Sequence, residues 1–168
     1  MSTESHPVLT LPASRNADPR EAPPLRWGMI GTGYVAHTFA ADVPVHTRHT
    51  LAVVCGRDQA RREAFAAQYG IPRSVASVDE LVNSSDIDAV YVATPHSDHH
   101  AHALAAIAVG KPVLVEKAFM QNAAQAIEVA AAARASGITT MEAMWTRFLP
   151  RHDVVRQILD SGLLGEIE

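Results

Sequence analysis

The chain has 168 residues, a formal net charge of −4 and 48% hydrophobic residues, values typical of a globular domain. Its lysines and arginines are scattered, which disfavours a nucleic-acid partner, and no apolar run approaches the ~20 residues that cross a bilayer. The single cysteine, Cys55, excludes an internal disulfide. With no export signal visible, we expect a cytoplasmic protein that does not bind membranes.

Proline and polar residues fill residues 1–24, and this composition predicts a disordered leader. From Leu25 onward, strand and helix patterns alternate. Strands are predicted over 25–30, 50–55, 74–76, 89–93, 113–115 and 138–144. Helices are predicted over 35–42, 58–68, 79–82, 98–109, between Asn122 and Gly137, and over 150–162, where the last one leaves the domain. Strands that are apolar on both faces predict an α/β fold, a Rossmann doubly wound parallel sheet, over 25–148.

A glycine-rich turn with the pattern G-x-G-x-x-A joins the first predicted strand to the first helix. Its residues are Gly31, Thr32, Gly33, Tyr34, Val35 and Ala36. Gly31 permits the tight turn, Gly33 lets the backbone approach a pyrophosphate, and Ala36 keeps helix and strand close. The helix N-terminus adds amide donors and the positive end of its dipole. The pattern predicts a dinucleotide site, with a structural turn that binds no ligand as the alternative.

The end of the second predicted strand indicates which dinucleotide would bind. An NAD site places an acidic side chain here, about twenty residues after the glycine turn, to bind the ribose 2′-hydroxyl. This chain has Gly56 and Arg57 at that position, and Arg61 follows one helical turn later. Two guanidinium groups facing one point suit a 2′-phosphate, so we predict NADP(H) as the cofactor. The alternatives are a solvated arginine face that includes Arg62, and an NAD-type role for Asp58, although a helix cap suits Asp58 better.

Three segments together resemble successive signatures of the Gfo/Idh/MocA oxidoreductases. They are Gly31–Ala36, Ala93–His99 (ATPHSDH) and Gly110–Lys117 (GKPVLVEK). The segment Met141–Phe148 (MEAMWTRF) is similar to the dimeric dihydrodiol dehydrogenase branch, which includes NADP-linked xylose dehydrogenases. The resemblance covers about residues 25–168 and implies that a C-terminal α+β domain is missing from this chain. Residues 149–168 would then be the start of a truncated substrate and oligomerisation domain.

The resemblance also implies roles for residues at the ends of strands. It places four residues along the nicotinamide ribose: Thr94, Pro95, His96 and His99. It places Glu116 and Lys117 beside the nicotinamide, with Lys117 as the catalytic residue against the substrate hydroxyl. A lysine kept neutral by burial and by a cationic nicotinamide can accept the hydroxyl proton as hydride leaves, and can donate it in the reverse direction. Without the resemblance, a lone lysine after a strand is more often a solvated surface charge.

The residue after Lys117 departs from the family pattern. The family commonly has E-K-P at this point, and the proline supports an unusual peptide geometry. This chain has Ala118 instead of proline. A cis bond before a residue other than proline costs about 3–4 kcal/mol, so this peptide is either trans or held cis by its surroundings.

Histidines and aromatic residues leave further alternatives open. Four histidines crowd together: His96, His99, His100 and His102. Zinc would require further ligands at suitable spacing, and none is present, so we expect no metal site and expect His100 and His102 to be solvated. Near the C-terminus, three residues either line a cleft or pack at the end of a strand: Trp145, Arg147 and Phe148.

Two function classes fit these residues. The first is an NADP-dependent oxidoreductase that transfers a hydride between the nicotinamide and a hydroxyl of a sugar or cyclic diol. The second is a stand-alone nucleotide-binding or redox-sensing module without turnover. For the first class we expect a small-molecule substrate, a chain that is inactive by itself, and homo-oligomerisation only in a longer form.

Overall fold

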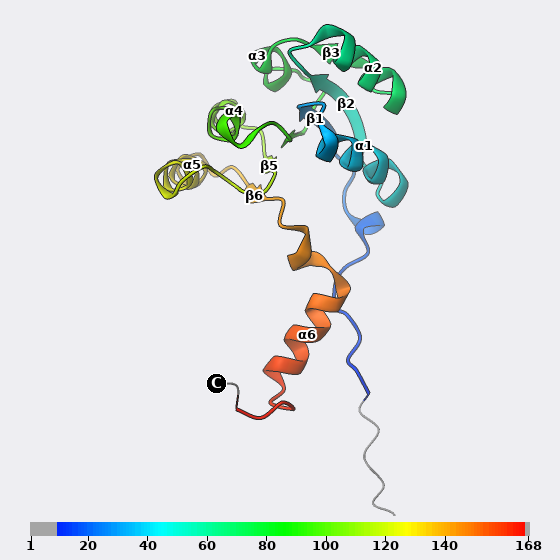
Figure 1. The fold of residues 1–168 in the computed structure, drawn as a ribbon, viewed down its shortest axis with the longest axis vertical. Coiled ribbons are helices and arrows are strands. Elements are labelled where there is room, and N and C mark those ends of the chain that lie inside the picture. The colour runs from blue at the N-terminus through cyan, green and yellow to red at the C-terminus, as the bar shows by residue number, and fades with distance from the viewer. Residues whose placement is uncertain (1–9, 167–168) are drawn as a thin grey trace, which may run out of the picture. The chain divides into compact units, whose positions relative to one another are not determined.

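The computed structural model describes residues 10–166, which fall into two compact units (Figure 1). The larger unit is Asp18–Ala143. The smaller unit combines the described residues of Met1–Ala17 with those of Met144–Glu168. The first nine residues of the predicted leader lie outside the described part of the chain.

Six parallel strands form the sheet of the larger unit, in the order β3-β2-β1-β4-β5-β6. Their bounds are β1 Arg26–Ile30, β2 Thr50–Cys55, β3 Arg73–Val75, β4 Ala89–Val92, β5 Val113–Val115 and β6 Thr140–Glu142. This strand order is that of a Rossmann fold, in which ligands bind where the order reverses, beyond the carboxyl ends of β1 and β4. The predicted doubly wound parallel sheet is therefore confirmed.

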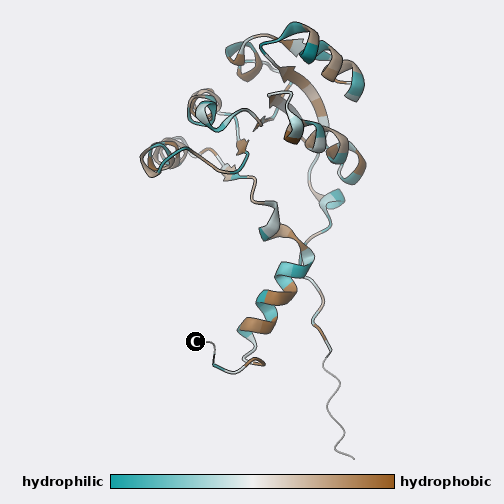
Figure 2. Cartoon of the chain, viewed as in Figure 1, coloured by the Kyte–Doolittle hydropathy of each residue, from teal (hydrophilic) through white to brown (hydrophobic). Residues whose placement is uncertain are grey.

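Helices cover both faces of this sheet. They are α1 Tyr34–His46, α2 Gln59–Tyr69, α3 Val78–Val82, α4 His96–Ala108 and α5 Ala123–Ser136, and a short 3-10 helix, Pro19–Glu21, precedes β1. One core cluster joins the sheet to α1 and α2, and a second joins it to α3, α4 and α5. In β4, Tyr91 belongs to the first cluster, whereas Val90 and Val92 belong to the second. The central strands β4 and β5 are apolar along their length for this reason, and Figure 2 shows most of β2 in the brown of hydrophobic residues as well.

Side-chain caps and glycines fix most helix ends where the sequence places them. The Asp58 carboxylate accepts a hydrogen bond from the Arg61 amide at 2.9 Å, and the Asn122 side chain accepts one from the Gln125 amide at 3.0 Å. Each such cap stabilises a helix by about 1 kcal/mol. At the other end of α5, Gly137 adopts φ 69°, the left-handed conformation that ends helices.

The observed bounds differ from the predicted ones by one or two residues at several ends, and two of the differing helix boundaries have a clear cause. α1 continues to His46 although Pro44, which has no N–H to donate, lies in its last turn. Both the amide and the hydroxyl of Thr47 donate to the carbonyl of Val43, at 3.1 and 2.6 Å, and close the helix there. α4 begins at His96 rather than Asp98, because Pro95 serves as its N-cap and accepts from the Asp98 amide at 2.9 Å.

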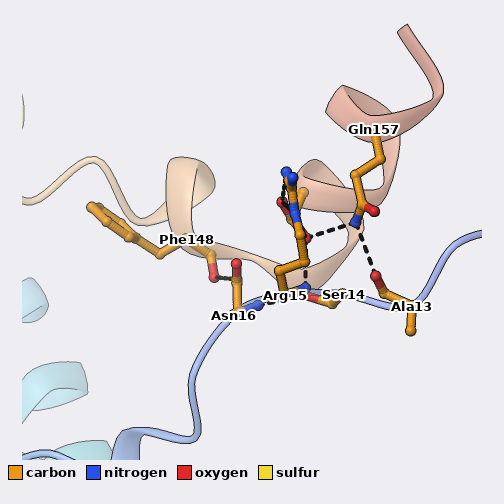
Figure 3. Close-up of polar contacts among 7 residues, drawn as sticks. Ala13, Ser14, Arg15, Asn16, Phe148 and Gln157 are labelled. Atoms are coloured by element: carbon orange, nitrogen blue, oxygen red, sulfur yellow. Dashed lines mark hydrogen bonds and ion pairs between the residues drawn. The ribbon is translucent and has the colours of Figure 1, made fainter. Parts of the chain in front are cut away.

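The smaller unit contains a 3-10 helix, Trp145–Phe148, and α6, Pro150–Asp160, held by a segment from the predicted leader (Figure 3). The Arg15 guanidinium forms an ion pair with Asp153 at 2.7 Å, and the Arg15 amide donates to the same carboxylate at 2.6 Å. Gln157 donates to the carbonyl of Ala13 at 2.9 Å, and Asn16 donates to the carbonyl of Phe148. These contacts give residues 13–16 defined partners on α6 and on the turn before it.

Within residues 10–166, no helix is both long enough and apolar enough to cross a membrane.

Candidate cofactor site

A cavity of about 700 Å³ lies at the carboxyl ends of β1, β2, β3 and β4 in the larger unit. Four groups of residues line it, each following one strand. They are Ile30–Val35 after β1, residues 55–58 with Arg61 after β2, Ala76 and Val78 after β3, and residues 93–95 with Asp98 and His102 after β4. This is the place where the strand order reverses, which is where open α/β sheets bind ligands.

The two glycines of the turn are required for different reasons. Gly31 has φ 110°, and a Cβ atom there would collide with the carbonyl group of Ala93, so the fold itself excludes a side chain. A Cβ at Gly33 would meet no protein atom within 4 Å. Gly33 therefore borders open space in the cavity, which suits the close approach of a ligand rather than the packing of the protein.

The first turn of α1 offers amide donors to this open space. Gly33 is the N-cap of α1 and provides no side-chain hydrogen bond to the helix. Tyr34 and Val35 line the cavity, while Ala36 is completely buried against the sheet. An uncapped N-terminus with a positive dipole end is suited to a pyrophosphate.

The arginines after β2 divide into two kinds. Arg57 and Arg61 line the cavity with exposed side chains, and among the described residues neither has a carboxylate within ion-pair distance. Arg62 instead folds back and donates to the carbonyl of Gly56 at 3.3 Å. The structure thus separates Arg62 from the pair that faces the cavity, and it commits the Asp58 carboxylate to the cap of α2.

Gly56 and Cys55 form the floor between the glycine turn and these arginines. A Cβ at Gly56 would lie 3.1 Å from Arg62 Cβ and 3.3 Å from Thr32 Cγ2, so a larger residue would push the turn away. Cys55 lines the same cavity, but burial raises the pKa of its thiol to about 11. A thiol with that pKa is protonated at neutral pH and is a poor nucleophile.

His96 and His99 connect the ends of β4 and β5. The Ala118 amide donates to His96 Nε2 at 3.2 Å. The His99 ring is completely buried, with Nδ1 3.1 Å from the carbonyl of Ala118 and Nε2 3.0 Å from the carbonyl of Thr94. In this structure the ring has no exposed surface and its nitrogens face backbone carbonyls, including that of the cavity residue Thr94. The expected contact of His99 with the cofactor stays a prediction.

Glu116 and Lys117 follow β5 and lie outside the set of residues that line the cavity. The Tyr91 hydroxyl donates to Glu116 Oε1 at 2.7 Å, and the Lys117 amide donates to Glu116 Oε2 at 3.1 Å. Burial, followed by the Glu116 carboxylate, raises the pKa of Tyr91. The Lys117–Ala118 peptide is cis. The Lys117 side chain is exposed, so the described residues do not supply the desolvation expected around a lysine base.

His102 is a cavity residue that the sequence pattern left among the solvated histidines. Its Nδ1 atom lies 3.2 Å from the Thr94 hydroxyl, and the residue lines the same cavity as Arg57 and Arg61. The helical spacing of Asp98 and His102, four residues apart, was the signal available, because such residues share a helix face. His100, in contrast, points to α5 and pairs with Glu128 at 2.9 Å.

Two further expectations concern aromatic residues and metals. Trp145 and Phe148 are more than half exposed, so core packing does not account for them within the described residues. Their place in a cleft stays a prediction. Across residues 10–166, no group of three or more histidine, cysteine, aspartate or glutamate side chains is arranged to hold a metal ion.

Comparisons with known proteins agree with this fold. A family described as "Oxidoreductase family, NAD-binding Rossmann fold" (GFO_IDH_MocA) matches residues 25–144. Trans-1,2-dihydrobenzene-1,2-diol dehydrogenase from Mus musculus is 36% identical over 146 residues, covering 85% of this chain and 44% of that protein. D-xylose 1-dehydrogenase (NADP(+)) from Hypocrea jecorina is 35% identical over 155 residues, covering 85% of this chain and 40% of that protein.

Solved structures show the same similarity. A mutant 3-ketoreductase from Actinomadura kijaniata, in complex with TDP-benzene and NADP, has a TM-score of 0.78 at 29% identity. The match covers 86% of this chain and 45% of that one. The chain thus spans somewhat less than half the length of these relatives. The sequence resemblance is confirmed: the chain belongs to the Gfo/Idh/MocA oxidoreductase family and carries its NAD-binding Rossmann fold.

Proposed function

We propose that the cavity binds NADP(H), and that the protein transfers a hydride between the nicotinamide and a hydroxyl group of a sugar or cyclic diol. The observation that carries the choice of NADP(H) is the pair Arg57 and Arg61, which line the cavity after β2 without ion-pair partners among the described residues. The Asp58 carboxylate, the one acid beside them in the cavity lining after β2, is occupied as the cap of α2.

A 2′-phosphate suits this end of the cavity for electrostatic reasons. It carries a charge of about −1.5 to −2 at neutral pH, and hydrogen bonds to charged groups contribute about 1.5–3 kcal/mol each. NADH lacks this phosphate and would leave both guanidinium groups unpaired. We therefore expect NADPH to bind at least about tenfold more tightly than NADH.

The pyrophosphate and ribose positions follow from the rest of the lining. Gly31 to Ala36 would hold the pyrophosphate through the amides of α1, and Gly56 leaves room beside Thr32. Thr94 and Pro95 line the cavity at the end of β4, where the nicotinamide ribose would lie. His96 follows Pro95 and accepts a hydrogen bond from the amide of Ala118, so it connects the end of β4 to the residue next to Lys117.

At the reaction end, we assign Lys117 as the group that accepts the hydroxyl proton during oxidation and returns it during reduction. The nicotinamide supplies the hydride acceptor and donor. The Glu116 carboxylate accepts hydrogen bonds from the Lys117 amide and from the Tyr91 hydroxyl, so that the backbone of Lys117 is held in a defined position. Desolvation of the exposed amine would come from substrate, cofactor or residues outside this chain.

The names of the relatives support the substrate class. One relative is a diol dehydrogenase, and another is a xylose dehydrogenase whose name specifies NADP(+). The ketoreductase was solved in complex with NADP and TDP-benzene. We place the reaction in a reducing, cytoplasmic compartment, which suits a buried free cysteine. Substrate binding and homo-oligomerisation are proposed for a longer form of the protein.

One observation favours a nucleotide-binding module without turnover as the second candidate. Lys117 is exposed and lies outside the cavity lining, whereas the phosphate end is already formed. For this polypeptide, binding therefore needs fewer additional groups than catalysis.

Fluorescence titration with NADPH and NADH tests the cofactor choice. Arg57→Ala should weaken NADPH binding about tenfold or more and leave NADH binding within about twofold of the wild type. Arg134→Ala is the matched control, because Arg134 is an exposed arginine of α5 that does not line the cavity. Equal dissociation constants of the wild type for the two cofactors would overturn the choice of NADP(H).

A further inference from the structure

His102 occupies a position in the cofactor cavity that the proposed function does not yet use. It is partly buried, it lines the cavity together with Arg57 and Arg61, and its Nδ1 atom lies 3.2 Å from the Thr94 hydroxyl. A titratable ring thus shares the cavity with the arginines after β2 and contacts a residue after β4. A neutral imidazole satisfies this geometry, because Nδ1 can accept the hydrogen bond that the hydroxyl donates.

The charges around His102 favour the neutral ring while the cavity holds no anion. Burial lowers the pKa of His102, Asp98 on the same helix face raises it, and His99 and Arg57 lower it further. Other charged groups of the neighbouring helices are engaged elsewhere. Glu128 of α5 pairs with His100, and on α3 Glu80 pairs with Arg73 while Asp79 accepts from Asn83.

Binding of a 2′-phosphate would favour the protonated form of the His102 ring. Paired with Arg57 and Arg61, it would cancel the positive charge that opposes protonation of His102 and add negative charge to the same cavity. NADH brings no such group to the arginines. The two cofactors should therefore differ in their effect on the ring.

We infer that His102 is a specificity-determining residue of the cofactor site: its ring takes up a proton when the 2′-phosphate of NADP(H) binds Arg57 and Arg61, so that the preference for NADPH over NADH increases as pH falls. The inference rests on the proposed NADP(H) site. The sign follows from linkage. A group with a higher pKa in the complex than in the free protein strengthens binding as pH falls through the pKa of the complex, and the gain levels off below the pKa of the free protein.

The protonation of the phosphate itself has the opposite sign. The second pKa of a phosphate monoester is about 6, so acidification removes charge from the 2′-phosphate and weakens its pairing with arginine. A protein without a titratable group at position 102 should lose NADPH preference on acidification. A protein with His102 should gain it.

The experiment measures dissociation constants of the full chain for NADPH and NADH by fluorescence titration between about pH 8 and about pH 6.5. We expect the wild-type NADPH preference to rise about two- to fourfold across this range, because the pKa of His102 in the free protein is lowered from its ordinary value and the range captures only part of the effect of a shift of about one pKa unit. In His102→Gln, which keeps a side chain able to hydrogen-bond Thr94, the preference should stay constant or fall. His100→Gln, which removes a histidine of the same helix that faces α5, should behave like the wild type.

Calorimetry in two buffers with different ionisation enthalpies provides the second measurement, since it counts the protons bound with each cofactor. Proton uptake with NADPH but not with NADH, and its loss in His102→Gln, supports the inference. The same pH profile in the wild type and His102→Gln, with NADPH preference intact, overturns the inference and leaves the cofactor choice standing. Absence of NADPH preference at every pH overturns the proposed function and the inference with it.

Discussion

The two ends of the cofactor site are built in different ways. The phosphate end is built from two short segments of the described chain, Gly31–Ala36 and the arginines after β2, which line an open cavity without hydrogen bonds between their side chains. The reaction end gathers His96, Glu116 and Lys117 from the ends of two strands through contacts with Ala118 and Tyr91. The proposed cofactor contacts at the phosphate end thus lie within short segments, whereas the position of Lys117 depends on contacts between side chains and backbone at the ends of β4 and β5.

Gly31→Val should have the largest effect, because it breaks the phosphate end at the backbone. A side chain at φ 110° would collide with the carbonyl of Ala93. We expect a loss of more than about 4 kcal/mol in the free energy of unfolding, measured by urea denaturation, and no detectable NADPH binding.

Gly33→Ala is the matched variant, because a Cβ there meets only open space. Its free energy of unfolding should change by about 1 kcal/mol or less, while NADPH binding weakens about tenfold or more. An equal loss of stability in both variants would contradict the view that Gly33 serves the ligand and Gly31 the fold.

Lys117→Met removes the amine at the reaction end and leaves the phosphate end unchanged. We expect turnover with NADP⁺ and a panel of sugars and cyclic dihydrodiols to fall about 10²–10⁴-fold, since a general base is lost. The NADPH dissociation constant should be unchanged, because Lys117 lies outside the cavity lining. Assays of this chain and of a longer form show which of them turns over. The Lys117→Met variant is then made in the form that turns over. If that variant keeps wild-type turnover, Lys117 is excluded as the base.

Asn122→Ala should have the smallest effect, because it removes a helix cap behind the site and touches neither end. Loss of the hydrogen bond to the Gln125 amide is expected to lower the free energy of unfolding by about 1 kcal/mol. Asn122→Ser should restore most of it. A change in NADPH affinity would show that α5 takes part in positioning the site.

The features that the sequence predicted correctly are those that depend on local chemistry. The turn at Gly31, the cap at Asp58 and the end of α5 at Gly137 each follow from the conformational preferences of one or two residues. The parallel sheet follows from strands that are apolar on both faces. Such patterns are visible within ten or so residues of sequence.

Histidine roles were predicted less well, because they depend on which segments the fold brings together. His99 is buried against the backbone of Thr94, five residues away, and of Ala118, nineteen residues away. His102 faces the cavity only because α4 packs with that side toward the end of β4. A cluster of histidines in the sequence carries no information about these directions.

The buried ring of His99 has a mechanical consequence for the reaction end. It occupies the space between the loop after β4 and the loop after β5, and neither loop can shift without pulling a polar ring away from its carbonyl neighbours. We therefore expect the two loops to move together as one rigid unit. Arg57 and Arg61 can be substituted one at a time to change the cofactor preference, whereas a redesign of the surface around Lys117 would have to move both loops together.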